Sequence, residues 1–275
     1  MICGAGRYMI PAMDTAFVLR LAASFLVAGT WISLATLAAE KLGSRLGGLI
    51  GNLPSNIVVS LIFVSLTKGP HFAAEAARAV PLGMAIDTVF LFTFVAAAGL
   101  GPLRAAPLAL LAWAAGAGLA LALPPLPMLA SVAVFVIVAG GLFLVAEGPL
   151  RIRAVPKRDS HFRPAALALR AVFAGSVVAT TVATASFAPP YLTGLIATFP
   201  AVLLSTMTIL SLAQGPDFAR ATGKILLLSS SNIVVYALVA QLSFPAVGWL
   251  AGSLLSFLAA AAWVALLRPL LAKAG

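Results

Sequence analysis

The sequence predicts an all-α membrane protein of nine transmembrane helices, arranged as two inverted four-helix repeats with one linking helix. Three observations lead to this prediction. Of the 275 residues, 62% are hydrophobic and 9% are charged. This composition lies outside the range of soluble domains, and apolar stretches of about 20 residues recur along the chain. A segment of the first half is repeated in the second, and the Lys and Arg residues divide unevenly between alternate loops.

Helices are favoured over a membrane β-barrel because the chain is rich in Ala, Leu and Val and lacks the alternation of polar and apolar residues that barrel strands show. In hydrocarbon every backbone polar group needs an internal partner, which a helix supplies within one segment. Hydropathy places the spans, in chain order, at residues 15–38, 46–66, 75–99, 104–122, 127–146, 164–186, 190–212, 219–241 and 245–268.

The internal repeat aligns residues 47–73 with residues 193–219 without a gap, at an offset of 146 positions. Both copies contain Gly-Leu-Ile, then Pro four residues after the Ile, then Ser-Leu-x-x-Gly-Pro-x-Phe-Ala. An odd number of crossings separates the copies, so the second copy is inverted, a plan common among secondary transporters. The predicted units are a first four-helix repeat at 1–126, a linking transmembrane helix with a basic cytoplasmic loop at 127–163, and a second, inverted repeat at 164–275.

The distribution of positive charge predicts the orientation. Four of the 17 Lys and Arg residues fall on the side of the N-terminus and the other 13 fall opposite. The positive-inside rule then places the C-terminus in the cytoplasm and the N-terminus outside the cell (inner) membrane. Because these cations border apolar helices, contact with membrane lipids explains the net charge of +10 better than a nucleic-acid partner does. The sequence leaves a homodimer open.

The second half resembles a known family. Its residues 167–269 carry Arg170 in the segment ALALRAV, TGLIATFP at 193–200 and PDFARAT at 216–222. These motifs resemble those of the GlpM-like small inner-membrane proteins, which have four helices and an A-G-L-I-x-x-F-P motif. The first half is a weaker match, since Asn52-Leu53 stands where the family has a residue before Phe-Pro. The resemblance implies a duplicated four-helix unit, and the family has no well-defined biochemical role to carry over.

Asp87 is the residue that most strongly indicates a functional site. It lies about 12 residues from either end of the predicted span 75–99, which at 1.5 Å per residue is close to the bilayer midplane. An unpaired carboxylate at that depth costs about 2.5–3.5 kcal/mol on insertion scales. We therefore expect Asp87 to face a polar interior, either protonated or paired with a cation, as an ion or substrate ligand. The alternative is a structural hydrogen bond between helices.

The repeat places further polar residues at the same depth. Ser229, Ser230, Ser231 and Asn232 align with the four residues that precede Asp87. Polar groups at one depth in both halves are what a central cavity between inverted repeats needs, so all four are predicted to line a solute or ion site. For the serines, ordinary packing between helices is the alternative interpretation.

The repeated prolines predict a break in the second helix of each unit. Pro54 and Pro200 each remove one helical hydrogen bond and free a carbonyl four residues earlier, at Ile50 and Ile196. Transporters place ion and substrate sites at such discontinuous helices. The predicted ligands around the breaks are Asn52, Pro54, Ser55, Asn56, Thr198 and Pro200. The alternative is a kink whose freed groups are satisfied by neighbouring Ser or Thr.

Catalysis is not predicted. The sequence has one Cys and two His, His71 and His161, both in predicted loops. It contains no phosphate-binding loop, metal-ligand cluster or Ser/His/Asp set, so no enzyme activity, metal or cofactor is expected. The four Trp residues, Trp31, Trp113, Trp249 and Trp263, are predicted to be partly interfacial anchors. Glu147 is expected to form a solvated ion pair at the cytoplasmic interface.

These observations predict a secondary transporter that moves a small solute by alternating access, with proton or cation coupling through Asp87. One acid among neutral polar groups suits a small polar or cationic solute better than a polyanion. Two alternatives stay open: a translocator of lipid or lipid-linked sugar, and a non-transporting membrane factor for envelope polysaccharide or complex assembly. A cavity of roughly a few hundred Å³ around Asp87 would argue against a packed, non-transporting protein.

Overall fold

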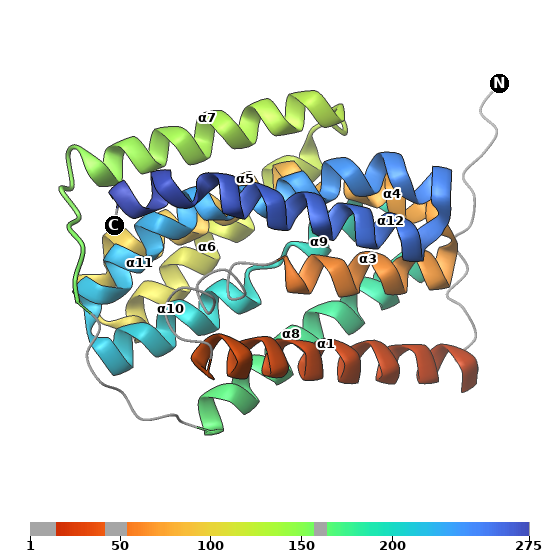
Figure 1. Ribbon diagram of the computed structural model, residues 1–275, viewed down its shortest axis with the longest axis horizontal. Coiled ribbons are helices and arrows are strands. Elements are labelled where there is room, and N and C mark those ends of the chain that lie inside the picture. The colour runs from red at the N-terminus through yellow and green to blue at the C-terminus, as the bar shows by residue number, and fades with distance from the viewer. Residues whose placement is uncertain (1–14, 42–53, 157–163, 275) are drawn as a thin grey trace.

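The computed structural model describes residues 15–41, 54–156 and 164–274. Within these ranges the chain is helical and contains no strand. Most helices run along the longest axis of the molecule, and the start of α1 and the end of α12 lie at opposite ends of it (Figure 1). The helices are α1 Thr15–Lys41, α3 Ser55–Lys68, α4 Pro70–Ala77, α5 Val80–Ala97, η1 Ala98–Leu100, α6 Pro102–Ala122, α7 Met128–Glu147, α8 Pro164–Phe187, α9 Pro190–Ala197, α10 Ala201–Gln214, α11 Pro216–Ser229 and α12 Ser231–Ala274.

Seven segments of the described chain are long and apolar enough to cross a membrane, judged by length and composition. The prediction of an all-α membrane protein is therefore confirmed at that level. The predicted span 46–66 begins among residues that the structure does not describe, and its described part forms the shorter apolar helix Asn56–Lys68. The predicted spans 219–241 and 245–268 fall within one segment, Pro216–Pro269.

That last segment contains a hairpin. Inside α12, Gly248 has φ 78° and ψ 172°, a conformation that only glycine adopts readily. Residues 17 positions apart in a straight helix would be separated by about 25 Å. Yet the hydroxyl oxygens of Tyr236 and Ser253 lie 2.9 Å apart. The two arms of α12 therefore lie antiparallel, as Figure 1 also shows.

Helices α1 and α8 pack against each other through a reciprocal pair of contacts. A Cβ atom added to Gly29 would lie 3.1 Å from the carbonyl oxygen of Ala171, and one added to Gly175 would lie 2.7 Å from the carbonyl oxygen of Phe25. The 146-residue offset of the repeat converts the first contact into the second. The two helices are antiparallel, and small residues allow the close approach that holds membrane helices together.

The backbone also turns in the same way at matched positions of the two halves. Pro54 has φ −76° and ψ 54°, and Pro200 has φ −78° and ψ 38°. Gly69 has φ 91° and ψ 162°, and Gly215 has φ 94° and ψ 167°. The repeated sequence motifs thus produce repeated local structure, a helix start at each Pro and a sharp turn at each Gly.

The predicted span 75–99 is not one continuous helix. It is interrupted at Arg78 and Ala79, between α4 and α5. Pro81 lies in the first turn of α5, where its missing N–H costs no hydrogen bond. In one continuous helix over residues 75–99, Pro81 would be an interior residue and would cost a hydrogen bond. The break before α5 places it in a first turn instead, and hydropathy does not detect this effect.

Helix α9 approaches α4 so closely that only glycine fits at the contact. A Cβ atom at Gly194 would overlap the backbone carbonyl oxygen of Ala76 and contact Ala79. A backbone atom cannot move aside as the end of a flexible side chain can. Gly194 belongs to the repeated Gly-Leu-Ile motif, so this contact explains one of the motif's two glycine positions.

We expect Gly194→Ala to destabilise the protein by about 1–3 kcal/mol, the usual effect of overpacking. In an open helical position Gly→Ala would instead add stability through helix propensity. Gly141→Ala in α7 is the matched control, because nothing lies within 4 Å of a Cβ atom there. Thermal denaturation in detergent should show a lower midpoint for the first variant only. Equal midpoints for the two variants would contradict the packing shown by the structure.

Candidate functional site

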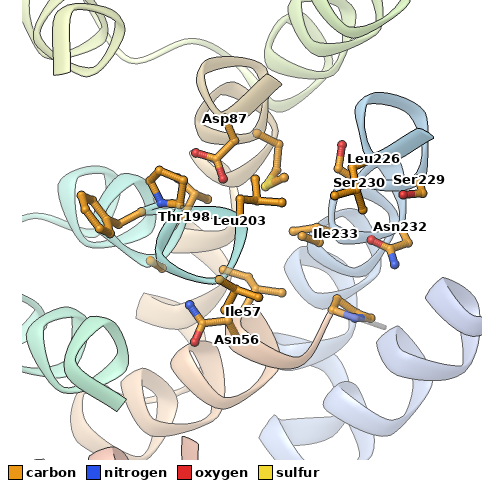
Figure 2. Close-up of a pocket in the computed structure, with 16 residues that line it drawn as sticks. Asn56, Ile57, Asp87, Thr198, Leu203, Leu226, Ser229, Ser230, Asn232 and Ile233 are labelled. Atoms are coloured by element: carbon orange, nitrogen blue, oxygen red, sulfur yellow. The ribbon is translucent and has the colours of Figure 1, made fainter. Parts of the chain in front are cut away.

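A cavity of about 120 Å³ lies where the broken helices of both halves meet. Its walls come from the start of α3, from α5, from the connection between α9 and α10, and from the junction of α11 and α12. Figure 2 shows Asp87 on one side, Asn56 on the opposite side, and Ser229, Ser230 and Asn232 together on a third. The polar side chains that line it are Asn56, Asp87, Thr198, Ser229, Ser230 and Asn232.

The structure brings most of the sequence-predicted ligands together. All six polar lining residues were among them, and Pro54 and Pro200 line the same cavity. Asn52 lies outside the described residues. Ser55 begins α3, but its side chain is likewise not described. The matched depth predicted from the repeat therefore corresponds to a shared cavity, whereas binding by these residues stays a prediction.

Ser231 is the exception. Its hydroxyl donates to the carbonyl oxygen of Leu228 at 2.7 Å and accepts a hydrogen bond from Trp263 Nε1 at 2.9 Å. It does not line the cavity. Successive residues of a helix point about 100° apart, so neighbouring serines cannot all face one cavity. Ser231 is therefore not among the residues that line the cavity, and its hydrogen bond with Trp263 joins the two arms of α12.

Asp87 is held in place by Trp113, which the sequence analysis did not assign to the site. Its side chain is buried on α5, and its Oδ1 atom accepts a hydrogen bond from Trp113 Nε1 of α6 at 3.0 Å. The Trp113 ring packs edge-on against Phe199, with 4.9 Å between ring centroids and 77° between planes. Phe199 lines the cavity at the break between α9 and α10. Trp113 thus connects the acid to the discontinuous helix.

The two proline positions begin new half-helices at the cavity. Pro54 is the N-cap of α3 and Pro200 that of α10, and neither proline side chain makes a capping hydrogen bond. In Figure 1 the two helices run from the middle of the molecule toward opposite ends. The carbonyl of Ile196, expected to be free for a ligand, accepts the Phe199 N–H at 3.0 Å. The helix starts, and not this freed carbonyl, are therefore what the break presents to the cavity. Ile50 lies outside the described residues.

Two polar side-chain atoms of the cavity lack a hydrogen-bond partner within the described protein. Ser229 is 2% exposed, and its hydroxyl oxygen makes no hydrogen bond there. The same holds for the Oδ1 atom of Asn56. By contrast, Thr198 and Ser230 donate to carbonyl oxygens of their own helices, those of Leu195 and Leu227. Buried polar groups normally have partners, so Ser229 and Asn56 are poised for a ligand or water.

The electrostatic character of the cavity is set by Asp87. Among the described residues that line it, no other carries a charge. The described chain also contains no cluster of three or more His, Cys, Asp or Glu residues that could hold a metal ion. The cavity thus offers one carboxyl group, hydroxyl and amide groups, and two helix starts.

A second hollow, of about 280 Å³, has a different character. It lies between α5, α6, α7 and the start of α9, and apolar side chains such as Ile86, Leu119 and Val138 line it, together with Tyr191. It shares no lining residue with the polar cavity. The two hollows lie on different faces of α5, since Ile86 lines one and its neighbour Asp87 lines the other.

Comparison of the chain with protein families, with characterised proteins and with solved structures gives no match. The resemblance of the second half to the GlpM-like proteins therefore stays a prediction.

Proposed function

We propose that this protein is a secondary transporter that moves a small solute across the cell membrane by alternating access, and not an enzyme. The observation that carries the proposal is the cavity around Asp87, which matched elements of both halves line together. A buried carboxylate, two broken helices and unpartnered polar groups at one place are typical of a site through which a solute and a coupling ion pass.

The proposed architecture has nine crossings. Counting α3 as the described part of one span and α12 as two, the chain gives two four-helix units with α7 between them. The reciprocal contacts of Gly29 and Gly175 and the matched angles at Pro54 and Pro200 support an inverted repeat. In this arrangement the units rock about the cavity, and Asp87 carries the proton or coupling cation.

At about 120 Å³ the cavity is smaller than the few hundred Å³ that would argue against a packed, non-transporting factor, so that alternative stays open beside the proposal. A comparable cavity of about 150 Å³ accepts benzene, so a solute of up to roughly six heavy atoms fits. A lipid translocator would need a polar path that continues into an apolar one. The separate linings of the two hollows do not favour that arrangement.

Transport is tested most directly in liposomes. Purified protein is reconstituted with a pH-sensitive dye inside the vesicles, and gradients of small solutes are imposed one at a time. A coupled carrier should change the internal pH with its own solute and not with others. Ser229→Trp, which fills the cavity, should abolish this response while the protein stays folded. A wild-type pH response that persists unchanged in the filled variant would exclude the cavity as the route.

We expect reporter fusions to give the orientation that the charge distribution predicts. A reporter after Gly275 should report the cytoplasm, and reporters inserted at residue 70 or 125 should report the outside. The described positive charges agree with this assignment, because Arg104, Arg151 and Arg153 would all lie in the cytoplasm. A reporter inserted near Leu150 is the control and should match the C-terminal one. A C-terminal reporter that reports the outside would contradict the proposed orientation.

A further inference from the structure

We propose that the solute is a small monovalent anion, such as a short carboxylate, which binds at the starts of α3 and α10 while Asp87 carries a proton. This inference rests on the proposed transport function and names its substrate class. It differs from the sequence-based expectation of a polar or cationic solute, because it takes account of helix starts that sequence alone does not orient.

The starts of α3 and α10 provide the positive pole of the cavity. The first N–H groups of a helix have no partner within it, and each helix start carries about half a positive charge. Asn56 and Ile57 of α3 and Val202 and Leu203 of α10, the second and third residues of each helix, line the cavity. The N-cap residue of each helix is a proline, whose side chain makes no capping hydrogen bond. Half-helix starts of this kind face anionic substrate groups in transporters.

Ser229 supplies a second, independent indication of a ligand. Its side chain is 2% exposed, its hydroxyl has no partner among the described residues, and it lines the cavity. Figure 2 shows Ser229 on the same side of the cavity as Ser230 and Asn232. A hydroxyl in that position donates to an anion, and the side-chain amide of Asn56, across the cavity from Asp87, can do the same.

Asp87 determines that the anion is monovalent and is accompanied by a proton. Two negative charges in one buried cavity repel each other strongly, since the low dielectric weakens screening. A proton on Asp87 removes this repulsion, and the loaded site then carries one anion and one proton with no net charge to move through the membrane. By linkage, the anion must in turn favour protonation of Asp87. A divalent anion would leave one charge uncompensated.

No other group of the described residues near the cavity can take the place of Asp87 in this linkage. Asp87 is the only titratable or charged side chain in the described lining. The described titratable or charged groups on the helices packed against α5 are Arg104, Glu147, Tyr191, Asp217, Arg220, Lys224, Tyr236 and Arg268, and none of them lines the cavity. Lys224, the cation buried on α11, is bound to Glu147 and to the Ile152 carbonyl.

The test compares four probes of similar size by thermal shift of the purified wild-type protein: acetate, acetamide, isopropylammonium and sulfate. Acetate should raise the denaturation midpoint in a concentration-dependent way, because a ligand of the folded state stabilises it. Acetamide and sulfate should have little effect. If isopropylammonium raises the midpoint more than acetate does, the anion inference is overturned. If acetate gives no shift, it is overturned as well. Neither result contradicts transport of another solute through this cavity.

Two variants and one further measurement sharpen the result. Ser229→Ala should weaken acetate binding about tenfold, the usual loss for one hydrogen bond to a charged group. Ser231→Ala, two residues away and outside the cavity, should leave it unchanged. In weakly buffered solution, at a pH where Asp87 is ionised in the unloaded protein, acetate binding should take up one proton in the wild type and none in Asp87→Asn. Equal proton uptake by both proteins would overturn the assignment of the proton to Asp87.

Discussion

Asp87→Asn should leave the protein folded and able to exchange its solute, and it should abolish accumulation against a gradient. Asn has nearly the volume of Asp, and its carbonyl oxygen can still accept the hydrogen bond that Trp113 Nε1 donates at 3.0 Å. What the variant loses is titration, and among the described lining residues no other side chain can replace it. Reconstituted vesicles provide the measurement, with exchange and gradient-driven uptake followed in the same preparation.

Asp87→Leu separates the structural role of this residue from its role in coupling. Leu removes the acceptor of the buried Trp113 N–H, which should cost about 1–3 kcal/mol of stability. The Asn variant should keep most of that stability. If Asp87 were only structural, the Asn variant would accumulate solute as well as the wild type does. That outcome would sink the coupling hypothesis, whatever the size of the cavity.

The repeat made the polar residues of the site predictable from sequence. Asp87 and Asn232 occupy adjacent columns of the alignment, and Pro54 and Pro200 occupy the same one. Matched positions in inverted halves lie at the same depth, so a polar residue in one half indicates where the other half has its own. Asp87, Asn232, Pro54 and Pro200 line one cavity, although they belong to segments about 30 to 180 positions apart.

Trp113 and Phe199 could not be found in the same way. Trp113 lies outside the aligned motif, and its composition-based interpretation is an interfacial anchor. Its contact with Asp87 depends on how α6 is rotated against α5, which packing determines and hydropathy does not. One signal was present: a buried carboxylate needs a donor, and Trp113 is on the next predicted helix. Ser231 was assigned to the site for a related reason. Neighbouring residues of a helix lie at nearly the same depth along its axis, but their side chains point in different directions.

The fold was predictable in class and at its two repeated proline breaks, but not at its other breaks. Apolar length identifies α6, α7 and α8 almost residue by residue. It does not identify the interruption between α4 and α5, and it places the turn within α12 at residues 242–244 and not at Gly248. These depend on single residues, a Pro in a first helical turn and a Gly with positive φ, which a window of about 20 residues averages out.

The ion pair between Lys224 of α11 and Glu147 of α7 departs most from its sequence-based interpretation. Glu147 was expected to form a solvated pair, and its side chain is half exposed. Its partner is not solvated: the Lys224 side chain is 3% exposed, and Nζ lies 2.9 Å from Glu147 Oε2. Nζ also donates to the Ile152 carbonyl oxygen at 2.6 Å. The pair joins α7 to the second half of the chain. The repeat-matched cation, Arg78, instead pairs with Glu75 in an exposed position.

Glu147→Gln should therefore lower the unfolding free energy by about 1–3 kcal/mol, because it leaves a buried ammonium group with one carbonyl as its described partner. The loss stays below that of a fully buried pair since Glu147 is half exposed and partly screened. Adding Lys224→Met should restore most of the stability by removing the uncompensated charge. Glu75→Gln is the matched control, and its exposed pair should contribute little. Thermal denaturation of the four proteins provides the test. Two outcomes would contradict this explanation: Lys224→Met fails to restore the denaturation midpoint of Glu147→Gln, or Glu75→Gln lowers the midpoint as much as Glu147→Gln does. In either case the stability lost would not come from an uncompensated buried charge.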